Sequence, residues 1–214
     1  MVTPEFIHID PADIETTSMA IIDAELVTPL DPVLAPIIKR VIHTTADFDY
    51  VETLTFSPGV VPLALNALTM GATIVTDTMM AQSGINRAAL EELGCQTRCF
   101  MADPETASLA KAKSTTRARV SMDLAAELEG PTIFAIGNAP TALVRLHELM
   151  LEGRLNPALI VGVPVGFVNV VPAKKLIMAS SVPYIVNRGR KGGSNVAAAI
   201  INALMYCLTR DDGR

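Results

Sequence analysis

The stretch Tyr184-Ile-Val-Asn-Arg-Gly-Arg-Lys-Gly-Gly-Ser-Asn-Val-Ala-Ala-Ala199 decides the fold prediction. A short apolar run ends, a basic glycine-rich loop follows, and an alanine-rich helix begins at Ser194. The loop contains the cations Arg188, Arg190 and Lys191 and the glycines Gly189, Gly192 and Gly193. Cationic side chains and the backbone N–H groups of a helix N-terminus both favour an anion. Because the whole chain is acidic, with a net charge of −5, this local positive charge predicts a small acidic ligand.

The same strand–loop–helix pattern recurs upstream of this stretch. Short apolar runs at 73–76, 96–101, 132–136 and 158–162 alternate with helical patterns at 87–93, 116–128, 141–152 and 172–180. Before them, residues 10–70 have the spacing of three helices. Such alternation predicts a parallel sheet that is covered by helices on both faces. We therefore predict one α/β domain over residues 1–214, a three-layer α/β/α arrangement. Its mainly parallel, Rossmann-like sheet has about five strands and follows an N-terminal helical segment.

Composition narrows the class of protein. Half of the residues are apolar and 18% are charged, so the chain must bury more surface than an average domain, and oligomerisation is one way to do so. No apolar run reaches the length of a membrane span, and the first residues do not resemble a signal peptide. Cys95, Cys99 and Cys207 form no metal-ligand pattern with the histidines. We expect a cytoplasmic protein with reduced cysteines, no metal site, no membrane contact and no nucleic-acid partner.

The loops that follow the predicted strands are the first place to look for a site. Ligands of parallel sheets bind beyond the carboxyl ends of the strands, which selects residues 77–81, 102–106, 137–141, 163–167 and 188–193. Each of these loops could be only a tight turn, since turns favour the same small residues. Three cations are not needed to turn a chain, so the basic loop is the strongest candidate. No phosphate-binding fingerprint and no G-x-S-x-G motif is present, which disfavours a nucleotide-dependent transferase.

His43 is the histidine whose position suggests chemistry. It stands at the predicted end of the second helix, four residues before Asp47. The helix dipole and a nearby carboxylate would both favour a protonated imidazole. A protonated histidine can act as a general acid, although a histidine that only caps the helix would have the same spacing.

Six segments spread over nearly the whole chain resemble the precorrin-8X and cobalt-precorrin-8 methylmutases of cobalamin biosynthesis. They are Arg40-Val-Ile-His-Thr-Thr45, Phe56-Ser-Pro-Gly59, Ile74-Val-Thr-Asp-Thr-Met-Met80, Ala135-Ile-Gly-Asn-Ala-Pro-Thr-Ala-Leu143, Val161-Gly-Val-Pro-Val-Gly-Phe-Val168 and Asn187-Arg-Gly-Arg-Lys-Gly-Gly-Ser194. The resemblance implies an isomerase that moves a methyl group from C11 to C12 of the corrin macrocycle. The product would be hydrogenobyrinate or, with cobalt in the ring, cobyrinate. It also implies a homodimer with a three-layer α/β fold.

The resemblance also assigns roles to residues. The catalytic histidine of the family falls on His43, a substrate-contacting serine on Ser18, and a Thr-Arg pair on Thr116 and Arg117. Two departures stand out. The family's Glu-Arg-Ser-Phe is Thr16-Thr-Ser-Met19 here, and Ala46 replaces a glycine that commonly precedes the aspartate.

A corrin intermediate is a large flat ring fringed by carboxylates, so its site should combine apolar faces with peripheral donors. We expect Met79, Met80, Val165 and Phe167 to line the faces. The predicted substrate-binding residues are Ser18, Asp77, Thr116, Arg117, Asn138, Thr141, Val163, Pro164, Arg188, Gly189, Arg190, Lys191, Gly192, Gly193 and Ser194. A sigmatropic methyl shift needs no cofactor, which fits a chain with one well-placed histidine. The alternatives are a non-catalytic corrinoid carrier, a nucleotide-dependent transferase and a structural subunit.

Overall fold

One sheet of six strands organises the chain, whose computed structural model describes residues 8–210. The strands are β1 (Leu54–Phe56), β2 (Thr73–Thr76), β3 (Gln96–Arg98), β4 (Thr132–Ile136), β5 (Leu159–Gly162) and β6 (Tyr184–Asn187). Their order across the sheet is β1-β6-β5-β4-β2-β3. All neighbours are parallel except β1, which pairs antiparallel with β6 at one edge. The chain leaves β2 in one direction to form β3 and returns on the other side of β2 as β4. The carboxyl ends of β2 and β4 therefore flank a topological switch point, where such sheets form a crevice.

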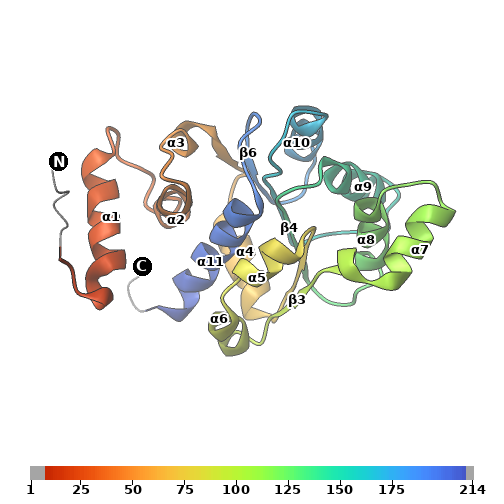
Figure 1. Cartoon of the computed structure of the whole chain (residues 1–214), viewed down its shortest axis with the longest axis horizontal. Coiled ribbons are helices and arrows are strands. Elements are labelled where there is room, and N and C mark those ends of the chain that lie inside the picture. Colours follow the sequence, from red (N-terminus) through yellow and green to blue (C-terminus); the bar gives the residue numbers. More distant parts are fainter. Residues whose placement is uncertain (1–7, 211–214) are drawn as a thin grey trace, which may run out of the picture.

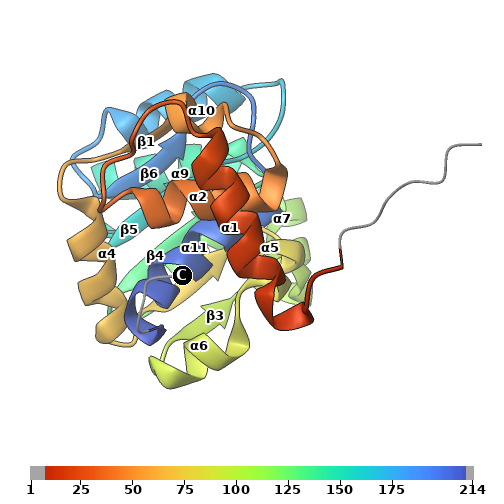
Figure 2. The ribbon, with the colours of Figure 1, turned by 90° about the vertical axis from the view of Figure 1, so that its left-hand side faces the viewer.

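Helices cover both faces of this sheet (Figure 1). One layer contains α2 (Ala35–Thr45), α4 (Val60–Thr69), α5 (Met79–Gly84), α6 (Arg87–Glu92) and α11 (Ser194–Thr209), and the opposite layer contains α7 (Pro104–Ala112), α8 (Arg117–Ala125), α9 (Pro140–Leu151) and α10 (Val170–Met178). The short α3 (Tyr50–Thr53) leads into β1, and two 3-10 turns lie at Pro11–Asp13 and Phe100–Ala102. Outside α2 lies α1 (Ile14–Glu25), which is nearest the viewer in Figure 2.

The central strands β4 and β5 read as continuous apolar runs because they are buried on both faces. In β4, Ile133 and Ala135 belong to the core on the α11 side, whereas Phe134 and Ile136 belong to the core on the α9 side. All four side chains are fully buried. This alternation within an unbroken apolar run is what a central parallel strand requires.

Small residues let α11 lie at the centre of its layer. Its alanines at 197–199 are buried against neighbouring helices, and a Cβ added to Gly84 of α5 would lie only 2.9 Å from the Cβ of Ala198. The two helices therefore approach as closely as their backbones allow. Among residues 8–210, no helix is both long and apolar enough to cross a membrane.

The predicted fold class is confirmed, and several boundaries differ. The sheet has a sixth strand, β1, which the sequence prediction missed because its three residues form no recognisable apolar run. The strand expected at 96–101 ends at Arg98, since residues 100–102 turn into a 3-10 helix. Two short helices, α5 and α7, occupy segments that were expected to be loop. Tertiary packing of these short segments outweighed their weak local signals.

Candidate functional site

Asp77 organises the carboxyl edge of the sheet at the switch point. It follows β2 and is fully buried. Its carboxylate accepts hydrogen bonds from the backbone N–H groups of Gly137 (2.9 Å), Asn138 (2.7 Å) and Ala139 (2.6 Å). Burial raises the pKa of this carboxyl, and the three N–H donors act in the opposite direction. Asp77 thus fixes the loop after β4 and leaves the Asn138 side chain exposed at the edge. A direct contact between Asp77 and a ligand stays a prediction.

The loop after β4 touches the start of α11 through its backbone. A Cβ added to Gly137 would lie 2.6 Å from the Cα of Ser194, so no larger residue fits without movement. Beside this contact, the hydroxyl oxygens of Thr78 and Ser194 are hydrogen-bonded at 2.8 Å. The structure therefore brings the predicted residues Asp77, Asn138 and Ser194 to one place.

The basic loop is pressed against the loop after β5. The N–H of Gly193 donates to the carbonyl oxygen of Val163 at 2.9 Å, and the N–H of Gly166 donates to the carbonyl oxygen of Arg190 at 3.1 Å. Gly192 has a φ of +151°, and a Cβ there would lie 2.0 Å from the Val163 oxygen. Only glycine meets both conditions. Val163, with Pro164 buried beside it, thus supports the loop that carries the cations.

The three cations of the basic loop have different partners. The guanidinium of Arg188 donates to the carbonyl oxygen of Glu52, and the ammonium of Lys191 lies 2.6 Å from carboxylate oxygens of both Asp47 and Asp49. The two aspartates raise the pKa of Lys191, with Asp47 the larger influence. The guanidinium of Arg190 instead lies 5.4 Å from the centre of the Phe167 ring. Within residues 8–210, Arg190 alone of the three makes no side-chain hydrogen bond, so it is the loop cation best placed to meet a ligand.

Apolar side chains surround these polar groups at the same edge. Met79, Met80, Val165 and Phe167 all follow the carboxyl ends of strands, and each is exposed. Phe167 is 82% exposed and Met80 is 72% exposed, which is unusual for such large apolar side chains. The edge therefore offers both elements that the sequence led us to expect, an apolar surface and a fringe of donors.

Ser18 and His43 both line a separate cavity of about 380 Å³ between α1 and α2. The cavity is lined by Ser18, Ile21, Ile22, Glu25, Ile42, His43, Ala46 and Phe48. His43 lies in the last turn of α2 with its imidazole exposed, as expected from the sequence. Ser18 donates to the carbonyl oxygen of Ile14 one turn earlier. Ala46 ends the helix in the left-handed conformation (φ 51°), a position that favours glycine.

Ion pairs tie the His43 cavity to the basic loop. Asp47 and Asp49 belong to the segment between α2 and α3, immediately after the cavity residue Ala46, and both bind Lys191. The helix that follows, α3, accepts the Arg188 side chain at the carbonyl oxygen of Glu52. The segment that follows the predicted general acid His43 is therefore joined by ion pairs to the basic loop, whose cations are predicted to bind carboxylates. The two segments are far apart in the sequence.

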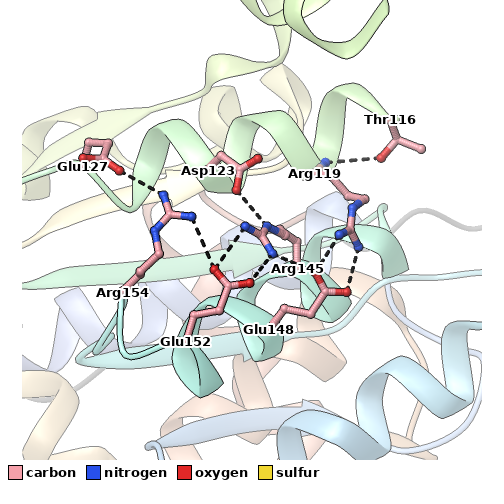
Figure 3. Close-up of polar contacts among 8 residues, drawn as sticks. All are labelled: Thr116, Arg119, Asp123, Glu127, Arg145, Glu148, Glu152 and Arg154. Carbon is pink, nitrogen blue, oxygen red and sulfur yellow. Dashed lines mark hydrogen bonds and ion pairs between the residues drawn. The ribbon is translucent and has the colours of Figure 1, made fainter. Parts of the chain in front are cut away.

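Thr116 and Arg117 lie at the N-terminus of α8, next to Thr141 at the N-terminus of α9. Thr116 caps α8 by accepting from the N–H of Arg119, and its hydroxyl lies 3.3 Å from that of Thr141. Along the same two helices, Arg145 joins Asp123, Glu148 and Glu152 in a chain of ion pairs (Figure 3). This network keeps the two helix starts side by side and leaves Arg117 exposed.

Two site residues were missed by sequence reasoning. Thr78 binds Ser194, and Lys174 of α10 donates to two carbonyl oxygens of the basic loop. A signal for Lys174 was present: Val170, Ala173 and Ile177 make up the buried face of α10, and a lysine interrupts that apolar pattern. Among residues 8–210, no cluster of three or more His, Cys, Asp or Glu side chains could hold a metal ion.

Comparisons with known proteins match nearly the whole chain. The family model for precorrin-8X methylmutase matches residues 13–207. The cobalt-precorrin-8 methylmutase of Salmonella typhimurium is 46% identical over 180 residues, which is 83% of each chain. The precorrin-8X methylmutase of a Sinorhizobium species is 37% identical over 94% of this chain and 97% of its own length.

The fold gives the same result. The crystal structure of precorrin-8X methylmutase from Thermus thermophilus superposes with a TM-score of 0.84 at 38% identity, covering 94% of this chain and all of that chain. Sequence and fold agree over almost the full length of the chain. The chain therefore belongs to the precorrin-8X methylmutase family of cobalamin biosynthesis and is an isomerase.

Proposed function

We propose that this isomerase moves the methyl group at C11 of precorrin-8X or cobalt-precorrin-8 to C12, giving hydrogenobyrinate or cobyrinate, with His43 as the general acid. The observation that carries the assignment of the acid is the shared cavity of Ser18 and His43, whose rim is bonded to the basic loop. The imidazole of His43 is exposed, and the residues Asp47 and Asp49 that follow its helix pair with Lys191 of the basic loop. Both observations support this proposal.

The chemistry requires little more than protonation and positioning. A [1,5]-sigmatropic shift moves the methyl group within one molecule, so it calls for no redox partner, nucleophile or cofactor. A proton from His43 would make the conjugated ring system electron-poor and lower the barrier to migration. General acid catalysis contributes roughly 10²–10⁴-fold, and the remaining acceleration comes from holding the ring in the reactive geometry.

Binding of the ring would use both parts of the strand edge. The exposed side chains of Met80, Val165 and Phe167 suit its apolar faces. Arg117 and Arg190 suit its acetate and propionate carboxylates, since a guanidinium binds a carboxylate through two hydrogen bonds. Val163, Gly192 and Gly193 support the basic loop through the backbone contacts described above. The other predicted residues are proposed as direct contacts of the substrate.

We also infer a cytoplasmic homodimer, built from one domain per chain over residues 1–214. Exposed apolar side chains of α1 and the segment after it support this, among them Ile14 (52% exposed), Ile21 (54%) and Val27 (98%). Covering them with a second copy would remove apolar surface from water next to the Ser18–His43 cavity. Sedimentation equilibrium that gives only monomer at micromolar concentration would contradict the dimer.

The experiment that tests the function uses His43→Ala with His147→Ala as control. His147 lies on α9, away from the cavity. Rearrangement of precorrin-8X, followed by the change in its visible absorbance, should fall 10²–10⁴-fold in His43→Ala. The dissociation constant for hydrogenobyrinate should stay within about twofold, because the acid contributes in the transition state. The control should keep both values.

Two outcomes would overturn the proposal. Turnover of His43→Ala at the wild-type rate would remove His43 as the acid. A wild-type protein that binds the corrin but leaves the absorbance of precorrin-8X and of cobalt-precorrin-8 unchanged would be a carrier, not an enzyme.

A further inference from the structure

Lys174 is a buried cation beneath the basic loop. It lies on the core-facing side of α10 and is 1% exposed. Its ammonium donates to the carbonyl oxygens of Gly189 (2.9 Å) and Lys191 (2.8 Å). Within residues 8–210, no carboxylate lies within 4.0 Å of it, and burial lowers the pKa of Lys174 to about 8. Burying a charge without a counterion costs free energy of folding, so a buried lysine at this position suggests a role other than packing.

A second buried donor acts beside it. Asn187, the last residue of β6, is fully buried, and its amide nitrogen donates to the carbonyl oxygens of Arg188 (3.2 Å) and Lys191 (3.0 Å). The amide oxygen of the same side chain has no hydrogen-bond partner in the described part of the chain. Buried donors therefore lie beneath the loop, and the carbonyl groups of Arg188, Gly189 and Lys191 are hydrogen-bonded to them.

The inward bonding of the carbonyls decides what the loop presents outward. Within residues 8–210, the backbone N–H groups of residues 189–192 have no acceptor. They therefore remain available to a ligand, as in other loops whose consecutive N–H groups bind anions. The charge beneath them also matters, because Lys191 is already paired with two aspartates while the Lys174 ammonium is balanced by carbonyl dipoles alone.

We propose that Lys174 is a positioning residue for substrate binding: its buried ammonium holds the carbonyl groups of the basic loop inward, so that the loop offers its N–H groups and Arg190 to a carboxylate of the corrin substrate. The inference rests on the proposed function, since it concerns how the same substrate is held. It assigns Lys174 no part in the methyl shift itself.

The test replaces Lys174 by methionine, which has nearly the same length and no charge. The dissociation constant for hydrogenobyrinate and the KM for precorrin-8X should both rise on the order of tenfold, the usual consequence of losing a charge-assisted hydrogen bond. The kcat should stay within about twofold, because the change removes binding that is common to substrate and transition state. Lys175→Met is the matched control: Lys175 is the exposed neighbour on the same helix, and its loss should leave both constants unchanged.

Lys174→Gln keeps the test decisive if the methionine variant does not fold. Its amide can donate to one of the two carbonyl oxygens, so KM should rise about threefold, between the wild type and Lys174→Met. A KM within twofold of wild type in a folded Lys174 variant would overturn the inference, as would a fall in kcat with KM unchanged. Failure of the proposed function is distinguishable, because the wild type itself would then not rearrange precorrin-8X.

Discussion

The α8–α9 pair and the outer helix α1 are held in place by different forces. On one side, α8 and α9 are joined by a chain of ion pairs from Arg119 to Arg154, and α9 buries Ala142, Leu143, Leu146 and Leu149 in the core. By contrast, α1 lies outside α2, buries only Ile22, and forms the ion pairs Glu15–Arg40 and Asp23–Lys39 with α2. A cavity of about 430 Å³ lies between α1, α2 and α11. The outer helix α1, which lines the cavity of Ser18 and His43, thus buries fewer side chains than α9.

This difference separates two tasks within the site. Of the groups that would bind the ring, Arg117 and Thr141 lie at the starts of α8 and α9, and Asn138 lies in the loop just before α9. The proposed acid and its serine lie where α1 meets α2, with apolar side chains still exposed. Precise positioning needs the first arrangement, whereas admission of a large ring or attachment of a second copy is easier in the second.

The largest expected effect compares one leucine of α9 with one isoleucine of α1. Leu146 is fully buried and Ile21 is 54% exposed. Leu146→Ala should lower the free energy of unfolding by about 3 kcal/mol, because it leaves a cavity in a closed core. Ile21→Ala should lower it by less than about 1 kcal/mol. Urea denaturation of both variants measures the difference.

If Leu146→Ala and Ile21→Ala lowered the free energy of unfolding equally, Ile21 could not be exposed as it is in the single chain. Ile21 would then have to be covered in solution. Repeating the denaturation at several protein concentrations would show whether a second copy covers it, since the stability of a dimer rises with concentration.

A smaller effect is expected at the end of α2. Ala46 adopts φ 51°, a left-handed conformation that costs a residue with a Cβ about 1–2 kcal/mol relative to glycine. Ala46→Gly removes this strain, but glycine also gains freedom in the unfolded chain, which offsets part of the benefit. The free energy of unfolding should therefore rise by only about 0.5–1 kcal/mol. Thermal unfolding followed by circular dichroism measures it. A lower midpoint would mean that the Cβ of Ala46 packs favourably enough in the His43 cavity to offset the strain.

How far the sequence predicts this molecule depends on the range of the interactions involved. Residues 132–136 and 184–186 were recognisable as strands because buried parallel strands are continuous apolar runs, and β6 extends the second of these by one residue. Gly192 and Gly193 were conspicuous because few loops need two adjacent glycines. Lys191 appeared to be a free cation, since its partners Asp47 and Asp49 are more than 140 residues away. Lys174 was overlooked for the same reason: only the fold shows that the loop carbonyls lie above it.

The smallest effect tests the ion pairs that join α8 to α9. Hydrogen bonds from Arg119, and then from Arg145, hold the pKa of Glu148 below its usual value of 4.5. A carboxylate with a lowered pKa stabilises the folded state above the unfolded pKa, and this contribution is lost as the pH falls through the folded pKa. At pH 7, Glu148→Gln should therefore be less stable than wild type by about 0.3–0.5 kcal/mol, a small value because the carboxylate is partly exposed to solvent.

The pH dependence distinguishes this from a simple packing effect. The stability difference between wild type and Glu148→Gln should shrink as the pH is lowered from 5 towards 3, because protonated Glu148 no longer attracts its arginines. Glu129→Gln is the matched control: Glu129 is exposed just after α8 and makes no ion pair within residues 8–210, so its variant should follow wild type at every pH. A Glu148→Gln difference that stays constant over this range would mean that shape and neutral hydrogen bonds, not charge, join α8 to α9. The contrast between α9 and α1 would then lie in their buried apolar side chains alone.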